Sequence, residues 1–296
     1  MFTRPNLEGR VAIITGSSRG IGKELALALA GAGADIVVAA KTTEPDPRLP
    51  GTIYETRDAV EALGRKSLAI KVNLREESEI EAMVSQTMET FGRIDILINN
   101  AGALWWRNVT DTPVKKFDLV MDVNARAAYA TTYHCLPHML KSDYGHIINM
   151  SPPVDMGMLP GKVAYSISKF GMTIIAQGVA AEHRGKNLAA NSLWPATMVE
   201  SQAAINFGLG APKNWRKPSV LTDAALAILS HEPRELSGHA LLDEDILAKV
   251  GVTDLEPYRC EPGGELIRIA GKTSVAAQFG TGAGGSDKAH TLTPST

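Results

Sequence analysis

An apolar run followed at once by three glycines constrains the fold of this chain more than any other feature. Residues 11–15 are apolar and rich in β-branched side chains, which predicts a buried strand. The turn Gly16-Ser-Ser-Arg-Gly-Ile-Gly22 comes next, and residues 23–34 form a helical pattern rich in Ala and Leu. Strand, glycine turn and helix in this order favour a dinucleotide-binding unit. A plain glycine turn is the alternative, because the spacing is GxxxGxG rather than the commoner GxGxxG.

Strand and helix alternate along the rest of the chain. We expect strands near residues 11–15, 36–40, 68–72, 95–98, 146–150, 188–193 and 239–243, and helices near 20–33, 53–64, 76–91, 114–141, 162–184 and 222–230. This order predicts an α/β fold, a single doubly wound parallel sheet of the Rossmann type with helices on both faces. We expect one domain over residues 1–270. Residues 271–296 are rich in Gly, Ser, Thr and Ala and are expected to form a flexible low-complexity tail.

The glycine turn and the end of the second strand define a candidate cofactor site. Free N–H groups and the positive end of the following helix suit a pyrophosphate. The second strand is followed by Lys41, where an NAD enzyme often presents a carboxylate to the ribose. Lys41 and Arg19 instead suit a ribose with a 2′-phosphate, so we expect NADP, with NAD less favoured. Solvated surface positions are the alternative for both side chains.

Tyr165 and Lys169 are four residues apart in a predicted helix, so they would share one face. A free tyrosine has a pKa of about 10, and a nearby positive charge lowers that pKa. A phenol tuned in this way can exchange a proton with a carbonyl or alcohol oxygen. Of the six tyrosines, only Tyr165 has a lysine at position i+4. For an isolated pair, a solvated helix edge is the alternative.

Further motifs follow in order along the chain. Asn99-Asn-Ala-Gly102 follows a strand-like run, Asn124 lies early in a long helical stretch, and Ser151 follows the fifth strand. Together with the glycine turn and the Tyr165–Lys169 pair, they resemble the short-chain dehydrogenase/reductase family over about residues 8–245.

The resemblance implies an oxidoreductase that uses NAD(P) and acts on CH–OH or C=O groups. Tyr165 would be the acid/base, and Lys169 would lower its pKa and hold the nicotinamide ribose. Ser151 would hydrogen-bond the substrate oxygen, and Asn124 would help to hold a water that relays protons to Lys169. Without the family pattern, Ser151 would be a strand-end cap and Asn124 an ordinary helix residue. The implied cofactor residues are Gly16, Ser17, Ser18, Arg19, Gly20, Ile21, Gly22, Lys41, Asn73, Asn100 and Lys169.

The chain departs from the family pattern at several positions. Asn73 stands where the family usually has an Asp that faces the adenine. Pro195 is followed by Ala196 rather than Gly, and Glu200 replaces a Thr that often contacts the carboxamide. Residues 241–245 lack the usual Gly-Gly after the last strand. Placement of the nicotinamide is the part of the site that these differences affect most.

The substrate side is predicted from apolar residues and from a loop without periodicity. Residues 198–218 contain Gly and Pro and resemble the substrate flap of the family, although a simple surface loop is the alternative. Trp105 and Trp106 could line a substrate mouth, a buried rim or a subunit contact. The substrate would be a small apolar carbonyl or alcohol, of acyl, aliphatic or steroid-like type. The expected pocket residues are Met156, Met158, Leu159, Trp194, Met198 and Phe207.

Composition narrows the partners and the compartment. A net charge of −2 and a pI of about 6.4 give no basic footprint for nucleic acid and no polybasic membrane anchor. No apolar run reaches the roughly 18 residues of a membrane span, and the early first strand leaves no room for a signal peptide. The two cysteines fit a reducing compartment, so we expect a cytoplasmic protein and a homo-oligomer, dimer or tetramer. His134 and His138 have a zinc-binding spacing but no third ligand, so no metal is expected.

Two other functions stay open at this point. A catalytically weak nucleotide-binding regulator would keep the fold, although the complete set of Asn124, Ser151, Tyr165 and Lys169 argues against it. A lipid-binding protein on the same fold is the other alternative. Turnover of NADPH with ketones, compared with fatty-acyl binding without turnover, separates the three.

Overall fold

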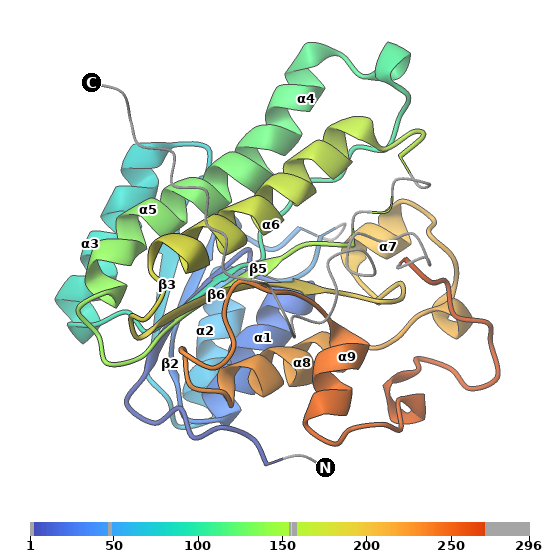
Figure 1. Ribbon diagram of the computed structural model, residues 1–296. Coiled ribbons are helices and arrows are strands. Elements are labelled where there is room, and N and C mark those ends of the chain that lie inside the picture. The colour runs from blue at the N-terminus through green and yellow to red at the C-terminus, as the bar shows by residue number, and fades with distance from the viewer. Residues whose placement is uncertain (1–2, 47–48, 154, 156–158, 270–296) are drawn as a thin grey trace, which may run out of the picture.

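A parallel sheet forms the centre of the protein. The computed structural model describes residues 3–46, 49–153, 155 and 159–269 (Figure 1). Within them, seven parallel strands follow the order β3-β2-β1-β4-β5-β6-β7, which confirms the predicted fold class. The strands are β1 (Val11–Thr15), β2 (Asp35–Ala40), β3 (Ser67–Lys71), β4 (Ile96–Asn99), β5 (Gly145–Met150), β6 (Leu188–Trp194) and β7 (Ala240–Leu242).

Helices cover both faces of the sheet (Figure 1). One face packs against α1 (Gly20–Gly31), α2 (Ile53–Glu61), α8 (Ser219–Leu229) and α9 (Asp243–Lys249). The other packs against α3 (Glu77–Phe91), α5 (Ala127–Met139) and α6 (Val163–Glu182), and α4 (Val114–Val120) extends the line of α5 beyond the sheet.

The strand β1 shows why this sequence makes a two-faced core. Ala12 and Ile14 belong to the cluster under α1 and α8, whereas Val11 and Ile13 belong to the cluster under α3 and α5. Successive side chains of a strand point to opposite faces, and both faces are covered here, so the strand is apolar throughout. Full burial of each large aliphatic side chain stabilises the fold by roughly 1.5–3 kcal/mol relative to exposure.

The strand order places a crevice at a defined point. The chain builds β1, β2 and β3 outwards in one direction, then crosses over so that β4 pairs with the other side of β1. In open α/β sheets, ligands bind beyond the carboxyl ends of the strands where this reversal occurs. The glycine turn after β1 and the Asn-Asn-Ala-Gly motif after β4 therefore meet at the expected binding point.

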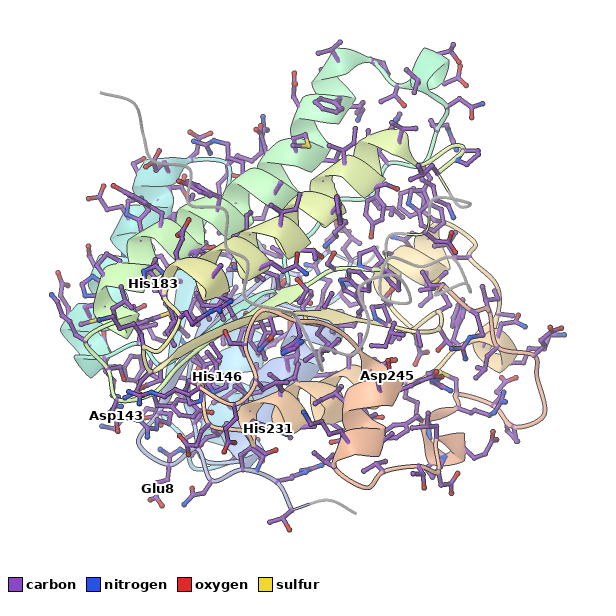
Figure 2. All side chains as sticks on the ribbon, in the orientation of Figure 1. Glu8, Asp143, His146, His183, His231 and Asp245 are labelled. Carbon is purple, nitrogen blue, oxygen red and sulfur yellow. The ribbon has the colours of Figure 1, made fainter. Side chains whose placement is uncertain are left out.

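Titratable groups also gather at the opposite, amino-terminal edge of the sheet. Arg10 Nη1 lies 2.6 Å from Asp143 Oδ1, and the buried carboxylate of Asp95 lies between Arg10 and Arg93. Burial lowers the pKa of His146 to about 3, so this histidine is a neutral core residue; Figure 2 shows it with Asp143 and His231. These groups lie at the end of the sheet away from the crevice, and the ion pairs of Asp95 join the N-terminal ends of β1 and β4.

Several elements differ from the sequence expectations. The helix predicted over residues 114–141 is divided by a π-helix, η2 (Met121–Arg126). Further short elements, not predicted, are α7 (Gln202–Asn206), α9, and the 3₁₀ turns η1 (Val109–Asp111), η4 (Pro212–Asn214) and η5 (Glu256–Tyr258). The predicted tail, 271–296, lies outside the described residues. Among the described helices, none combines the length and the apolar character needed to cross a bilayer.

Candidate active site

The glycine turn presents bare backbone at the carboxyl end of β1. Gly16 has φ of +68°, a conformation that favours glycine, and a Cβ there would lie 2.8 Å from the Cα atom of Ala101. A Cβ on Gly22 would overlap the carbonyl oxygen of Gly16. Beside Gly20, at the start of α1, nothing lies within 4 Å of such an atom. The turn and the first N–H groups of α1 can therefore approach a pyrophosphate closely.

The Ser17 hydroxyl stabilises the shape of the turn. The Ser17 hydroxyl donates to the carbonyl of Ile14 (2.7 Å) and accepts from the N–H of Ala39 (3.1 Å), which joins β1 to β2. Ser18 is buried, and Ile21 packs against the core beneath α1. Of these predicted cofactor residues, Ser17 and Ile21 thus act on the turn through their side chains.

Asn100 and Asn73 lie at the carboxyl ends of β4 and β3. The Asn100 amide donates to the carbonyls of Thr15 (3.0 Å) and Gly16 (3.3 Å), so it holds the glycine turn against β4. The backbone N–H of Asn73 donates to Glu79 at 2.7 Å, and its side chain is half-buried at the end of β3. Both residues lie where the sequence predicted them.

Arg19 is used differently from the prediction. Its Nε donates to the carbonyl of Pro50 (3.1 Å) and its Nη2 to that of Gly51 (2.9 Å). A Cβ on Gly51 would lie 2.5 Å from the Ser18 carbonyl oxygen, so the two loops touch. Two of the three guanidinium nitrogens of Arg19 therefore hold the connection after β2 in place. Lys41 is exposed at the end of β2.

Tyr165 and Lys169 lie one turn apart on α6, as predicted. Lys169 Nζ donates to the carbonyl of Met150 at 2.9 Å and lies 3.4 Å from the sulfur of Met172. Burial lowers the pKa of Lys169 to about 8 and raises the pKa of Tyr165. The sequence predicted that Lys169 lowers the pKa of Tyr165, whereas burial of the phenol raises that pKa in this structure.

The π-helix η2 brings Asn124 into contact with α6. The Asn124 amide accepts from the N–H of Ala103 (2.7 Å) and donates to the Ala103 carbonyl (3.0 Å) and to Ser168 Oγ (2.9 Å). Ser168 donates to the carbonyl of Tyr165 (2.7 Å). Asn124 therefore joins the loop after β4 to the turn of α6 that carries the tyrosine. A π-turn inside a helix often marks a functional position.

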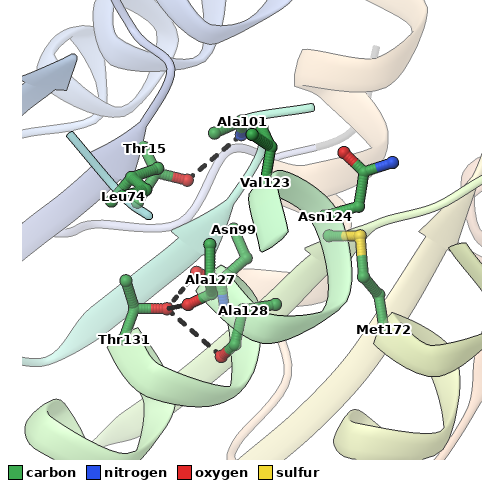
Figure 3. Close-up of a pocket in the computed structure, with 10 residues that line it drawn as sticks. All are labelled: Thr15, Leu74, Asn99, Ala101, Val123, Asn124, Ala127, Ala128, Thr131 and Met172. Carbon is green, nitrogen blue, oxygen red and sulfur yellow. Dashed lines mark hydrogen bonds between the residues drawn. The ribbon is translucent and has the colours of Figure 1, made fainter. Parts of the chain in front are cut away.

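A narrow crevice lies beside this junction. It is lined by Thr15, Ala101, Asn124, Met172 and six other residues (Figure 3). A Cβ on Gly102 would lie 3.3 Å from Lys169 Nζ, so glycine at this position leaves room for the ammonium. The crevice itself lies between the ends of β1 and β4, the π-helix η2 and Met172 of α6.

Ser151 is fully buried, and its hydroxyl faces the backbone of α6. It donates to the carbonyl of Lys169 at 2.8 Å and accepts from Thr173 Oγ1 at 3.4 Å. The indole N–H of Trp194 in turn donates to Thr173 Oγ1 (3.1 Å). A hydroxyl that donates to a substrate oxygen would have to leave the Lys169 carbonyl, so this is not the arrangement that the predicted role of Ser151 requires. The prediction that Trp194 lines the pocket is wrong, because this side chain is fully buried.

Trp106 packs against Tyr165 at the open side of the site. The two rings meet edge to face with centroids 6.0 Å apart. Lys162 Nζ lies 4.4 Å from the centroid of the Trp106 ring, and burial lowers the pKa of Lys162. Trp106 therefore lies beside Tyr165, the predicted acid/base, and the choice among a substrate mouth, a buried rim and a subunit contact stays a prediction.

The flap over residues 198–218 is paired with the last described segment. Met198 N–H donates to the carbonyl of Ile267 (2.7 Å), and Ile269 N–H donates to the carbonyl of Ala196 (2.9 Å). Among the expected pocket residues, Leu159 and Met198 are half-buried and Phe207 is 48% exposed. Met156 and Met158 lie outside the described residues.

Comparison with known proteins decides the family. The sequence pattern of the family described as short chain dehydrogenase matches residues 10–207. The chain belongs to this family. Members of the short-chain dehydrogenase family are NAD(P)-dependent oxidoreductases, and the glycine turn fits that cofactor, because nothing lies within 4 Å of a Cβ at Gly20, at the start of α1.

Relatives in animals share this region. The chain is 44% identical over 264 residues to hydroxysteroid dehydrogenase-like protein 2 of Xenopus tropicalis, which covers 88% of this chain and 63% of that protein. The match to the human protein of the same name is 42% identical over 260 residues, 87% of this chain and 62% of that protein. The chain thus spans less than two thirds of the length of these relatives.

Solved structures of short-chain dehydrogenases share the fold. A putative dehydrogenase from Xanthomonas campestris is 40% identical, with a TM-score of 0.85 over 89% of this chain and 97% of the other. Carveol dehydrogenase from Mycobacterium avium, solved in complex with NAD, is 25% identical, with a TM-score of 0.71 over 80% of this chain and 97% of the other.

Sequence reasoning missed three residues of this short-chain dehydrogenase site. Ser168 joins Asn124 to Tyr165, Thr15 accepts from the backbone of the loop after β4, and Gly102 leaves space for Lys169. Ser168 lies one residue before the lysine and Thr15 one residue before the glycine turn, so neighbours of a motif were the available signal. For Gly102 the signal was its place at the end of Asn-Asn-Ala-Gly.

Proposed function

We propose that the protein is an NADP-dependent carbonyl reductase or alcohol dehydrogenase with a largely apolar substrate. The observation that carries the proposal is the position of Tyr165 and Lys169. Lys169 Nζ lies 3.3 Å from where a Cβ of Gly102 would be, and the Tyr165 ring packs on Trp106. Acid/base and lysine therefore both lie beside the loop that follows β4, at the point where such a sheet binds its ligand.

The residues of this chain would supply the proton and hold the cofactor and the substrate in position. When bound, NADP(H) would donate or accept the hydride. Tyr165 would give its phenolic proton to the carbonyl oxygen during reduction, and burial keeps that proton in place by raising the pKa. Lys169 would hold the ribose and, as a cation, stabilise the phenolate that forms. Asn124 and Ser168 would hold the turn of α6 that carries Tyr165.

We propose a positioning role for Ser151. Its hydroxyl satisfies the carbonyl of Lys169, so it fixes the backbone from which the ammonium extends. Pro152, the next residue, has no N–H and no polar side-chain atom, so it cannot donate a hydrogen bond to a substrate oxygen in place of Ser151.

The preference for NADP rests on Lys41. This exposed cation at the end of β2 lies where an NAD enzyme often presents a carboxylate. Arg19 contributes indirectly, because it holds the loop after β2 against the glycine turn through Pro50 and Gly51.

We further propose that residues 1–270 act as one dehydrogenase domain in the cytoplasm and that two copies associate. The helices α5 and α6 lie side by side (Figure 1). Both carry exposed apolar side chains, which support the association. Tyr129, Tyr133 and Ile174 are each more than half exposed. Sedimentation equilibrium of wild type and of Ile174→Lys tests it, and identical masses would refute this interface.

NADPH oxidation with a panel of aliphatic, acyl and steroid-like ketones tests the proposed activity. We expect turnover of at least one ketone by wild type. Binding of NADPH without turnover of any ketone, or of any alcohol with NADP⁺, would favour the nucleotide-binding regulator. Fatty-acyl binding without turnover would favour the lipid-binding protein.

A further inference from the structure

Two lysine–tryptophan pairs lie in the same region, and they differ in one respect. Lys116 Nζ lies 4.8 Å from the ring centroid of Trp105, whose indole N–H donates to Thr112 Oγ1 at 3.2 Å. Lys162 Nζ lies 4.4 Å from the ring centroid of Trp106, whose buried indole nitrogen has no hydrogen-bond partner among the described residues. Only the second pair touches the acid/base, because Trp106 packs on Tyr165. The indole N–H of Trp105 therefore has an acceptor within the protein, whereas that of Trp106 has none within the described part of the chain.

Lys162 occupies an unfavourable place for a cation. It is half-buried and is the N-cap residue of α6, where the positive end of the helix dipole opposes a positive charge. No carboxylate among the described residues lies within ion-pair distance of its ammonium. The Trp106 ring offsets part of this cost through a cation–π contact. The protein thus keeps a poorly compensated charge three residues before Tyr165.

We infer that Lys162 and the indole N–H of Trp106 bind a carboxylate carried by the carbonyl substrate. A carboxylate has two acceptor oxygens, so one group can accept from the ammonium and from the indole together. The apolar surface of the same indole would contact the carbon chain between the carboxylate and the carbonyl. The substrate class is therefore a keto acid or hydroxy acid with an apolar chain. This inference rests on the proposed function and specifies its substrate.

The test compares a keto acid with its methyl ester, which keeps the ketone and removes the charge. We expect wild type to prefer the acid in kcat/KM. Lys162→Met should lower kcat/KM for the acid roughly tenfold to hundredfold, the value of one charge-assisted hydrogen bond, and leave the ester within about twofold. Lys116→Met is the matched control and should change neither. Lys162→Arg should keep the preference and shows that loss of charge, not of folding, is responsible.

A binding measurement separates this inference from the proposed activity. Isothermal titration calorimetry with the saturated fatty acid of matched chain length, and with its amide, needs no turnover and no tryptophan signal. Tighter binding of the acid in wild type, lost in Lys162→Met and in Trp106→Phe, supports the site even when no ketone is reduced. Equal binding of acid and amide, or equal losses for acid and ester in Lys162→Met, overturns the inference while the oxidoreductase assignment stands.

Discussion

The nucleotide side and the substrate side of the sheet are stabilised by different kinds of interaction. Around β1 and β2 the loops are fixed by backbone geometry, as at Gly16 and Gly22, and by uncharged hydrogen bonds such as those of Ser17. Beyond β6 the flap is fixed by contacts between segments far apart in sequence. Arg216 Nη1 lies 2.6 Å from Glu244, and Arg268 lies 2.8 Å from the same carboxylate. The nucleotide side therefore depends on backbone shape, whereas the flap depends on charged side chains of segments far apart in the sequence.

The largest expected effect separates chemistry from binding. Tyr165→Phe should reduce kcat by roughly 10²–10⁴-fold, the usual contribution of a positioned general acid, because it removes the proton but keeps the ring packed on Trp106. The dissociation constant of NADPH should stay within about twofold. Steady-state kinetics on an accepted ketone and a fluorescence titration measure the two quantities. Near wild-type kcat would show that another residue is the acid/base.

The second prediction concerns the nucleotide side alone. Lys41→Asp should reduce the preference for NADPH over NADH by roughly tenfold to hundredfold, because it replaces an attractive charge with a repulsive one at the end of β2. Arg19→Met should weaken both cofactors to a similar degree, because Arg19 holds the backbone of Pro50 and Gly51. Dissociation constants at one fixed salt concentration check both variants. A ratio that Lys41→Asp leaves unchanged would make Lys41 a solvated loop residue.

Most of the fold, and the residues that lie at motifs, were predictable from the sequence. The seven strands were predicted within one or two residues of their observed bounds, because fully buried strands are continuous apolar runs. The π-turn at Asn124 was missed because a single extra residue hardly changes a helical period. The position of Ser151 was predicted correctly, but the direction of its hydroxyl depends on the packing of β5 against α6. Sequence spacing carries no information on that direction.

The third prediction tests whether Ser151 is a positioning residue. Ser151→Ala removes the side-chain hydrogen bond to the carbonyl of Lys169, which keeps its helical donor, so we expect a loss of roughly 0.5–1.5 kcal/mol in the free energy of unfolding. We also expect kcat to fall with little change in the dissociation constant of NADPH. Chemical denaturation and kinetics measure the two. A fall in kcat with unchanged stability would instead support a direct contact between Ser151 and the substrate oxygen.

The smallest predicted effect is a pH dependence of stability that is confined to the substrate side of the sheet. Asp243, buried at the end of β7, accepts from the N–H groups of Ala196 and Glu244, and burial raises its pKa to about 6. Because this value exceeds the unfolded pKa of about 3.9, the folded state holds the extra proton between about pH 4 and pH 6. The contribution of this group to the free energy of unfolding therefore falls as pH rises through that window and is constant above it. The positive charge of Arg216 lowers the pKa of Asp243, but burial has the larger effect.

Asp243→Asn keeps an acceptor oxygen and removes the titration. Wild type should lose free energy of unfolding from pH 4.5 to pH 7, whereas Asp243→Asn lacks this loss. The difference between variant and wild type should therefore shift in favour of the variant, as measured by urea denaturation at both pH values. Hydrogen exchange should show the effect at Ala196 and Met198 but not at β1. An equal change on both sides of the sheet would contradict the contrast between them.

The pairing of the flap with residues 267–269 also bears on the order of folding during synthesis. Domains generally begin to fold from the N-terminus as the chain is made. The glycine turn meets its partners at β2 and β4 early, whereas Met198 obtains its partner only when Ile267 emerges. A nascent chain that has reached residue 250 can therefore complete the nucleotide side while the flap still lacks this partner. Cofactor binding during synthesis would precede formation of the substrate site.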